Sequence, residues 1–368
     1  MDLAGNVIGE RFVVVSFGES HGRCVGAVVD GCPAGLELSE ADIQRELDLR
    51  RPGVSSLSSP RAEEDKVEIL SGVFEGRTTG SPICMLVWNR DVDSEPYRIF
   101  VNRPRPGHAD YVARMKYGGF ADWRGGGRFS GRITAGFVMA GAVAKKLLSK
   151  ALNVEIMAYA LEIGGIRARR FTLEDIRRKR YTNEARCPDE SAAAEMIRKI
   201  NEVKSQGDSL GGIVECQVFG LPAGLGEPVF SSLDSDLSRA LFAIPAVKGV
   251  EFGVGFEAAR LLGSQNNDPY AIVDGKVITT TNNAGGILGG MSTGMPLVLR
   301  VAFKPPPSIA KKQKTIDLGS MKEVEIVVGG RHDPTVVPRA VPVVEAVVAI
   351  VLADHAIRAG FIPPVIRD

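Results

Sequence analysis

The chain has 368 residues, of which 44% are hydrophobic and 24% charged, as expected for a globular protein with a substantial core. Its 45 basic and 44 acidic residues nearly cancel, so the charge balance gives no indication of a nucleic-acid partner. Scattered cysteines without a CxxC pair, and no signal-peptide pattern, favour reduced thiols in a cytoplasmic protein over disulfides or a zinc site: Cys24, Cys32, Cys84, Cys187 and Cys216.

The N-terminal part of the chain predicts strands, one helix and a glycine-framed turn. Strands are expected at 11–17 and 24–29, on either side of the turn GESHG at 18–22. Ser39 is followed three residues later by Asp42, which is close to the pattern of a capping box. This pattern predicts a helix that Pro52 ends. Residues 67–88 predict further strands around a glycine-rich turn.

Long apolar helices dominate the rest of the pattern. Residues 89–132 are loop-rich, and 133–152 predict a helix whose small residues indicate central burial. A charged helical stretch at 173–206 and a strand at 211–220 lie between it and a similar apolar helix at 339–360. The run 341–353 contains Glu345 and is too short for a membrane span, so a buried core helix is expected there, with no membrane. Without a βαβ rhythm, this pattern predicts one α+β domain over 1–368.

Two distant segments share a short motif. TTGSPICMLVW (78–88) and STGMPLVLRVAF (292–303) both read Thr-Gly-x-Pro before a β-type run. They indicate equivalent elements of a duplicated scaffold, although convergent turn chemistry explains so short a likeness about as well.

Two other motifs match known functional patterns but lack the neighbouring strands and loops that those functions require. GESHG matches the G-x-S-x-G nucleophile elbow of serine hydrolases, but one strand before Ser20 leaves no room for the upstream oxyanion loop. GVGFEA (253–258) resembles a dinucleotide-binding string but lacks a buried first strand and a βαβ series, so a packing turn is favoured. No P-loop string for nucleoside triphosphates occurs in the sequence.

Three of the four histidines lie in loops framed by glycine or proline. His21 lies in GESHG, His108 in RPRPGHAD and His332 in GGRHDP, each near a carboxylate or an arginine. Imidazole titrates near pH ~6.5 and can exchange a proton at neutral pH. Each histidine alone could merely hydrogen-bond its own turn, but three such loops favour a shared site. His355 follows an apolar helical pattern and is interpreted as structural.

Arginines occur in the same kind of loop. Guanidinium groups bind carboxylate and phosphate in a bidentate manner, so this local excess in a nearly neutral chain predicts a pocket for a small polyanion. The glycines at 125–127 would let backbone N–H groups approach an anion. A solvated surface explains Arg51, Arg103 and Arg124 equally well. The full set is Arg50, Arg51, Arg103, Arg105, Arg124, Arg128, Arg132 and Arg331.

Together these motifs resemble a known family. GESHG, RRPG (50–53), SGVFEGRTTGSPI (71–83), RPGHADY (105–111), RGGGRFSGR (124–132), PAGLGEPVF (222–230), AVKGVEFGVGFE (246–257), NNAGGILGG (282–290) and RHDP (331–334) occur in the order typical of chorismate synthases. The resemblance covers essentially the whole chain.

The resemblance implies a fold, an activity and partners. The family fold is a β-α-β sandwich with long central helices between antiparallel sheets, assembled as a homotetramer. Its members are lyases that convert 5-enolpyruvylshikimate-3-phosphate to chorismate and phosphate by 1,4-trans elimination, the last common step of aromatic amino acid biosynthesis. They use reduced FMN without net redox change. NADPH is expected as a further cofactor only if the enzyme reduces its own flavin. Otherwise an external flavin reductase would supply the reduced FMN.

The resemblance also implies residue roles. His21 would protonate the departing phosphate, His108 would stabilise the reduced, anionic flavin, and Asp333 would assist removal of the C6 proton, with flavin N5 as acceptor. Arg50, Arg105 and Arg132 would bind substrate, and Arg331 would hold substrate or flavin. Flavin contacts would come from Arg128, Phe129, Ser130, Pro245, Ala246, Gly289, Lys304, Pro305, Pro306, Pro307, Ser308 and Arg331, some of them across a subunit interface.

Some positions depart from the family pattern. Phe129 stands where many members have a small polar residue, Pro245 where asparagine is frequent, and Ser56 where many have a basic residue. The run KPPPS at 304–308 replaces one rich in serine and threonine. These departures affect individual flavin contacts. A non-catalytic module that binds flavin or an anion is the remaining alternative.

Overall fold

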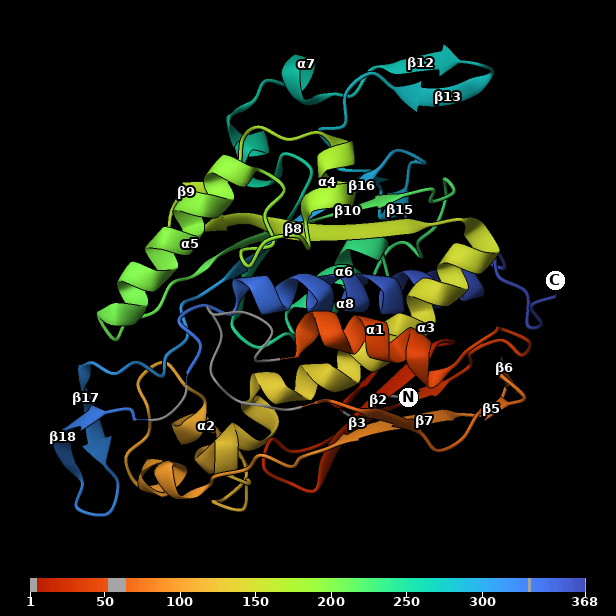
Figure 1. The fold of residues 1–368 in the computed structure, drawn as a ribbon. Helices are drawn as coiled ribbons and strands as arrows, with labels where there is room; N and C mark the ends of the chain where they lie inside the picture. The colour runs from red at the N-terminus through yellow and green to blue at the C-terminus, as the bar shows by residue number, and fades with distance from the viewer. Residues whose placement is uncertain (1–4, 52–63, 330–331, 368) are drawn as a thin grey trace.

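Two five-stranded antiparallel sheets enclose long helices in the computed structural model (Figure 1). The structure describes residues 5–51, 64–329 and 332–367. The first sheet has the order β1-β2-β3-β7-β4, with strands Val7–Ile8, Val13–Gly18, Cys24–Asp30, Ile83–Trp88 and Val67–Ile69. The second has the order β11-β16-β10-β8-β9, with strands Val247–Phe252, Leu297–Phe303, Gly212–Phe219, Glu155–Ile163 and Ile166–Arg167. The predicted α+β sandwich is therefore confirmed.

The helices between the sheets are those that the apolar patterns predicted. α3 spans Thr134–Leu152 and packs along α8, Val337–Arg358, between the two sheets (Figure 1). A Cβ placed on Gly141 of α3 would lie 2.3 Å from Cβ of Ala346 in α8, so glycine is what lets the two helices approach so closely. α1 (Glu40–Arg50) begins at the predicted capping box, and α6 (Leu233–Leu241) packs on α8.

A buried ion pair fixes the middle of this helical layer. The Glu345 side chain on α8 is fully buried, and its Oε2 lies 2.8 Å from Lys145 Nζ on α3. Its Oε1 accepts a hydrogen bond of 2.8 Å from the Ala158 N–H of β8. α8 is long and apolar enough to cross a membrane, but 94% of its most apolar window is buried inside the protein. Its hydropathy is therefore that of a core helix.

The same topology occurs twice in the chain. Each half runs strand, strand, helix, strand, strand and long helix: β2, β3, α1, β4, β7 and α3, then β8, β10, α6, β11, β16 and α8. The pairing orders β2-β3-β7-β4 and β8-β10-β16-β11 correspond. β7 begins directly after Pro82 and β16 directly after Pro296. The two Thr-Gly-x-Pro segments thus precede equivalent strands.

The structure adds detail to two stretches of the sequence pattern, the charged helical stretch and the loop-rich region at 89–132. The charged helical stretch 173–206 forms two helices, because Pro188 and the Asp189 cap start a new one: α4 (Leu173–Lys179) and α5 (Glu190–Ser205). The loop-rich region contains η1 (Glu95–Val101), α2 (Asp110–Lys116), η2 (Arg124–Phe129) and η3 (Gly131–Ile133). The remaining short elements are β5 (Val73–Phe74), β6 (Arg77–Thr78), η4 (Gly255–Arg260), α7 (Gly263–Asn266), β12 (Tyr270–Val273), β13 (Lys276–Thr279), β14 (Ile287–Leu288), β15 (Met291–Ser292), β17 (Lys312–Asp317) and β18 (Lys322–Val327).

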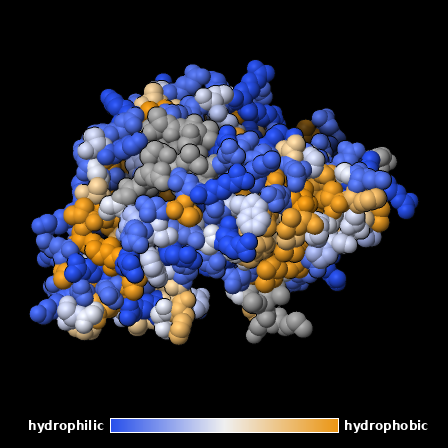
Figure 2. Space-filling model, turned by 60° about the horizontal axis from the view of Figure 1, so that its bottom comes forward, coloured by the Kyte–Doolittle hydropathy of each residue, from blue (hydrophilic) through white to orange (hydrophobic). Residues whose placement is uncertain are grey.

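Apolar side chains are exposed on the projecting elements. On the face in Figure 2 hydrophobic residues gather in separate patches among hydrophilic ones. The hairpin β12–β13 projects from the body of the protein in Figure 1 and exposes Tyr270, Ile272 and Val277.

Candidate functional site

A cavity of about 640 Å³ opens where four loops and the start of α8 meet. Its volume falls within the range of small-molecule sites, roughly 300–1,000 Å³. Its lining combines apolar residues such as Ile244, Val336 and Val343 with a strong excess of cations, which favours an anionic ligand that carries an apolar ring. The cations that line it are Arg50, Arg105, Arg128, Arg132, Lys248, Lys304 and Arg339.

His108 lies at this cavity in a fixed orientation. Its Nδ1 is 2.6 Å from Asp110 Oδ1, and Arg105 Nη2 is 3.3 Å from its Nε2. Asp110 also binds Arg105 through Nε and Nη2, both at 2.8 Å. Burial lowers the pKa of His108 below its ordinary value of 6.5; the hydrogen bond that His108 donates to Asp110 opposes this, and the Arg105 charge adds to the lowering. His108 is therefore a neutral imidazole at pH 7, with Nδ1–H donating to Asp110.

His21 lies one layer behind the cavity surface. Its Nδ1 is 2.9 Å from Ser94 Oγ, and its ring packs edge-on against Tyr97, a cavity-lining residue, with centroids 5.2 Å apart. A Cβ on Gly125 would lie 2.2 Å from His21 Cδ2, and Gly125 has a φ of +58°. Only glycine satisfies both conditions, and its missing side chain leaves the imidazole next to the cavity. The next glycine, Gly126, contacts His108, so the glycine loop lies between the two histidines.

The RHDP loop reaches the same cavity from the start of α8. His332 and Asp333 both line it, and Asp333 Oδ2 lies 2.5 Å from Arg339 Nη1. Burial lowers the pKa of His332, a hydrogen bond to the Gly329 carbonyl opposes this, and the Arg105 charge lowers it further. The three histidine loops predicted to share a site therefore meet around one cavity, as the sequence indicated.

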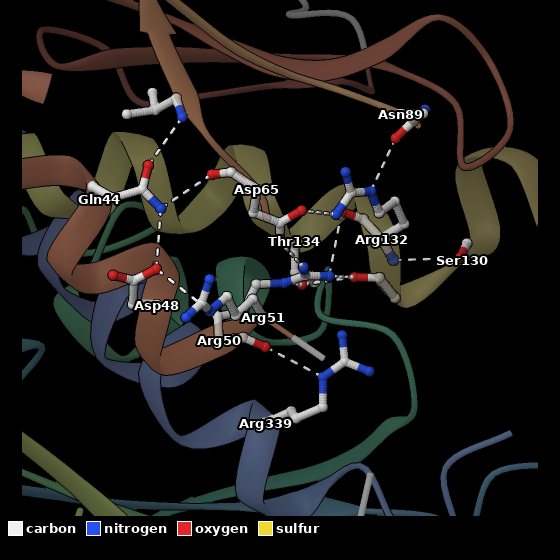
Figure 3. Close-up of polar contacts among 12 residues, drawn as sticks. Gln44, Asp48, Arg50, Arg51, Asp65, Asn89, Ser130, Arg132, Thr134 and Arg339 are labelled. Carbon is white, nitrogen blue, oxygen red and sulfur yellow. Dashed lines mark hydrogen bonds and ion pairs between the residues drawn. The ribbon is translucent and has the colours of Figure 1, made fainter. Parts of the chain in front are cut away.

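Two of the predicted substrate arginines are held by a carboxylate that the sequence did not single out. Arg50 and Arg132 both pair with Asp65, which is buried between them (Figure 3). Arg50 also donates from Nε to Thr134 Oγ1 at 3.0 Å and from Nη2 to the Gly131 carbonyl at 2.8 Å. Burial, together with Arg339 and Arg132, lowers the pKa of Arg50 to about 9 while Asp65 opposes this. The Arg50 guanidinium group thus donates much of its hydrogen-bonding capacity to acceptors within the protein.

Most of the predicted flavin residues line the cavity. These are Arg128, Phe129, Ser130, Pro245, Ala246, Lys304, Pro306, Pro307 and Ser308. Gly289 and Pro305 do not: Gly289 lies in the turn between β14 and β15, and Pro305 sits between two lining residues. Arg331 and Ser56 lie outside the described residues. Phe129, the departure from the family pattern, is 37% exposed and faces Tyr117 with ring centroids 6.5 Å apart.

The hydrolase interpretation of GESHG finds no support in the geometry. Ser20 is fully buried. Within the described part of the chain its Oγ has no hydrogen-bond partner, so no base activates it. His355, interpreted as structural, is buried in α8 with Nε2 3.0 Å from Asp236 Oδ2.

Sequence reasoning missed several residues of the site. Asp110 lies inside the quoted motif RPGHAD, two residues after His108, and that spacing could have identified it. Asp65 and Arg339 offered no local pattern, because each meets its partners only in the folded chain. The same is true of Ser94, Tyr97 and Lys248.

Comparisons with known proteins assign the family. The family model described as chorismate synthase matches residues 12–357. The chain belongs to the chorismate synthase family.

Chorismate synthases similar to this chain come from archaea and bacteria. The protein of Korarchaeum cryptofilum is 58% identical over 356 residues, covering 97% of this chain and 98% of that protein. The protein of Methanosarcina mazei is 57% identical, covering 98% and 99% respectively, and that of Dehalococcoides mccartyi is 54% identical, covering 99% and 100%. A crystal structure of a chorismate synthase aligns with a TM-score of 0.75 at 33% identity, covering 96% of this chain and 93% of that chain.

Proposed function

We propose that this chain converts 5-enolpyruvylshikimate-3-phosphate to chorismate and phosphate by 1,4-trans elimination, using reduced FMN without net redox change. The observation that carries the proposal is the single cationic cavity that His108, His332, Asp333 and the GESHG loop surround. The substrate has two carboxylates and a phosphate, which match a cavity rich in arginine and lysine.

The residues present fit a flavin as well as the substrate. A flat apolar ring system needs apolar surface, which Phe129, Ile244 and Val343 provide, and a phosphate needs cations. Lys304 is one cation of the lining, and its Nζ donates to the Gly107 carbonyl. Burial and the neighbouring Lys248 lower its pKa. Reduced flavin, when bound, would lend electron density to the substrate and recover it.

Each catalytic residue contributes through the contacts it makes. His21 donates a proton to the departing phosphate oxygen from a ring held by Ser94 and Tyr97. As the bond from C3 to the phosphate oxygen breaks, its electron pair leaves with the phosphate. The C1–C2 π pair shifts to C2–C3, and the pair from the C6–H bond forms a C1–C6 double bond. Bound reduced flavin would supply the acceptor for the C6 proton. Asp333, held by Arg339, assists that proton's removal. His108 presents a hydrogen-bonding imidazole oriented by Asp110.

The assembly and the source of electrons belong to the same proposal. We propose a homotetramer on the resemblance to the family; the exposed apolar side chains of the hairpin β12–β13 agree with association of subunits but do not fix their number. A cytoplasmic location agrees with five free cysteines. We propose that an external reductase supplies reduced flavin, since the GVGFEA string lies in η4 and the turn before it rather than in a dinucleotide fold.

Phosphate release tests the proposal. With chemically reduced FMN and no oxygen, the wild-type protein should release phosphate from 5-enolpyruvylshikimate-3-phosphate, and His21→Ala should be about 100-fold slower. A serine-directed acylating reagent should leave the protein unmodified, because Ser20 is buried. No phosphate from the wild-type protein would reject the lyase and leave the non-catalytic binding module.

A further inference from the structure

Asp65 is a buried carboxylate between two cations of the cavity. Its side chain is fully buried; Oδ2 lies 3.0 Å from Arg50 Nη1, and Oδ1 pairs with Arg132 Nη1 (Figure 3). The Arg50 and Arg132 side chains are themselves almost wholly buried, although both line the cavity. One carboxylate thus determines how far apart these two guanidinium groups lie.

Asp65 is ionised in the folded protein. Burial favours its neutral form, but the charges of Arg50 and Arg132 outweigh this and hold the pKa of the carboxyl below its usual range. Arg339, which binds Asp333 and donates from Nε to the Arg50 carbonyl at 3.2 Å, adds a third positive charge nearby. Among the described residues, Arg50 and Arg132 thus pair with Asp65, and Arg339 pairs with Asp333.

The contacts of Asp65 extend to the loop that carries His21. Arg132 donates from Nε to Asn89 Oδ1 at 2.9 Å. Asn89 in turn donates from Nδ2 to the carbonyls of Glu19 at 3.0 Å and Gly22 at 2.9 Å, which bracket His21 in the chain. Arg132 is therefore joined to the GESHG loop through Asn89, which keeps its own two hydrogen bonds to that loop.

We propose that Asp65 is a positioning residue for the anionic groups of the substrate, because it holds Arg50 and Arg132 at the separation that receives them. The inference rests on the proposed function and deepens it. Positioning and a purely electrostatic effect predict opposite changes in the affinity for anions when Asp65 is neutralised. Removing the Asp65 charge makes the cavity more positive, so charge alone would tighten anion binding, whereas loss of positioning weakens it.

The variant Asp65→Asn tests this, with Asp48→Asn as its matched control. Asp48 lies near the end of the same helix as Arg50 and is 45% exposed, with its Oδ1 3.5 Å from Arg51 Nε (Figure 3). Each variant removes one negative charge. Asp65→Asn should raise KM and the inhibition constant of inorganic phosphate by roughly 10-fold, with kcat within about 3-fold of wild type. Asp48→Asn should leave all three within about 2-fold.

Three outcomes would overturn the inference. If folded Asp65→Asn binds phosphate as tightly as wild type or more tightly, Asp65 does not position the arginines. If kcat falls while KM and phosphate inhibition stay constant, its role is only structural. If Asp65→Asn does not fold, Thr134→Val removes an acceptor of Arg50 without changing charge, and it must raise both constants by about 3-fold. Unchanged constants in that variant reject the inference.

Failure of the proposed function can be distinguished from failure of the positioning role of Asp65. If the wild-type protein releases no phosphate from the substrate, calorimetric titration with inorganic phosphate alone still compares wild type, Asp65→Asn and Asp48→Asn. Weaker binding in Asp65→Asn only would then support positioning without the reaction, and equal binding in all three would reject it.

Discussion

At the scale of single residues, the site is built from charged groups that fix one another. Asp110 engages both His108 and Arg105, and Asp65 engages both Arg50 and Arg132. In each case a buried carboxylate, rather than solvent, determines where a cation or an imidazole points. The carboxylates should therefore matter for substrate binding or for turnover even where they do not touch the ligand.

Asp110→Asn should lower kcat by about 10-fold or more, because asparagine has one acceptor oxygen where the carboxylate has two. Its NH2 group would then face either the His108 Nδ1–H or the Arg105 Nε–H, and the ring would lose its orientation. Anaerobic phosphate release measures this. Glu155→Gln, which neutralises an exposed partner of Arg177, is the control and should behave as wild type. Equal kcat for Asp110→Asn and wild type would refute the orienting role.

Gly125→Ala should reduce turnover by at least about 10-fold and destabilise the protein by about 1–2 kcal/mol, because the new Cβ meets the His21 ring and the residue has a positive φ. Gly263→Ala is the matched control, since nothing lies within 4 Å of its Cβ position. Turnover and urea unfolding would be measured for both variants. Wild-type turnover in Gly125→Ala would mean that the glycine is not required beside His21.

The residues that the sequence identified are those that lie in short, recognisable motifs. His21, His108 and His332 lie in short Gly- and Pro-framed motifs, so they could be found without coordinates. Asp65 could not, because it lies 15 residues from Arg50 and 67 from Arg132, in no recognisable motif. Arg339 is even more distant: the contact with the Arg50 carbonyl spans 289 residues.

At the scale of elements, the two long helices carry the site and join the sheets. α3 follows the glycine-rich loop directly, and α8 follows the RHDP loop, so their packing fixes the distance between two walls of the cavity. Apolar periodicity and small residues predicted both helices. The division of 173–206 into α4 and α5 was not predicted, although Pro188 and the Asp189 cap are a local signal for it.

Gly141→Ala should destabilise the protein by about 1–3 kcal/mol, because its Cβ would overlap Ala346 and force α3 and α8 apart. Ser149→Ala, at an exposed position of the same helix, should change the free energy of unfolding by less than about 0.5 kcal/mol. Chemical denaturation of both variants checks this. A Gly141→Ala protein as stable as wild type would show that the helices are not in close contact there.

At the scale of the whole molecule, duplication explains why the scaffold has two similar sheets. Each half repeats one strand order and ends in a long helix, and the helices of the two halves pack against each other. The repeated Thr-Gly-x-Pro motif indicated that the two halves are related. The corresponding strand orders could be seen only in the structure, because no local sequence pattern encodes strand pairing.

The protein should lose stability as pH falls from about 7 to 5. The folded-state pKa values of His108 and His332 lie below 6.5, so the unfolded chain binds protons that the folded protein does not, and stability decreases with falling pH in this window. Buried carboxylates such as Asp65, whose pKa is also lowered, add a further loss only below about pH 4.

Thermal unfolding in phosphate-free buffer at pH 7.5 and pH 5.5 measures this dependence. The double variant His108→Gln/His332→Gln should show a smaller decrease in Tm between the two values than the wild-type protein. The same decrease in both proteins would assign the pH dependence to other groups.

A single-turnover reaction without oxygen, followed by separation of the products, tests whether the cavity binds flavin and substrate together for the elimination. We predict that enzyme, substrate and reduced FMN give chorismate and phosphate in equal amounts, and that oxidised FMN or no flavin gives neither. Phosphate released without chorismate, or equal conversion in the absence of flavin, would contradict the account of a flavin and a polyanion sharing one cavity.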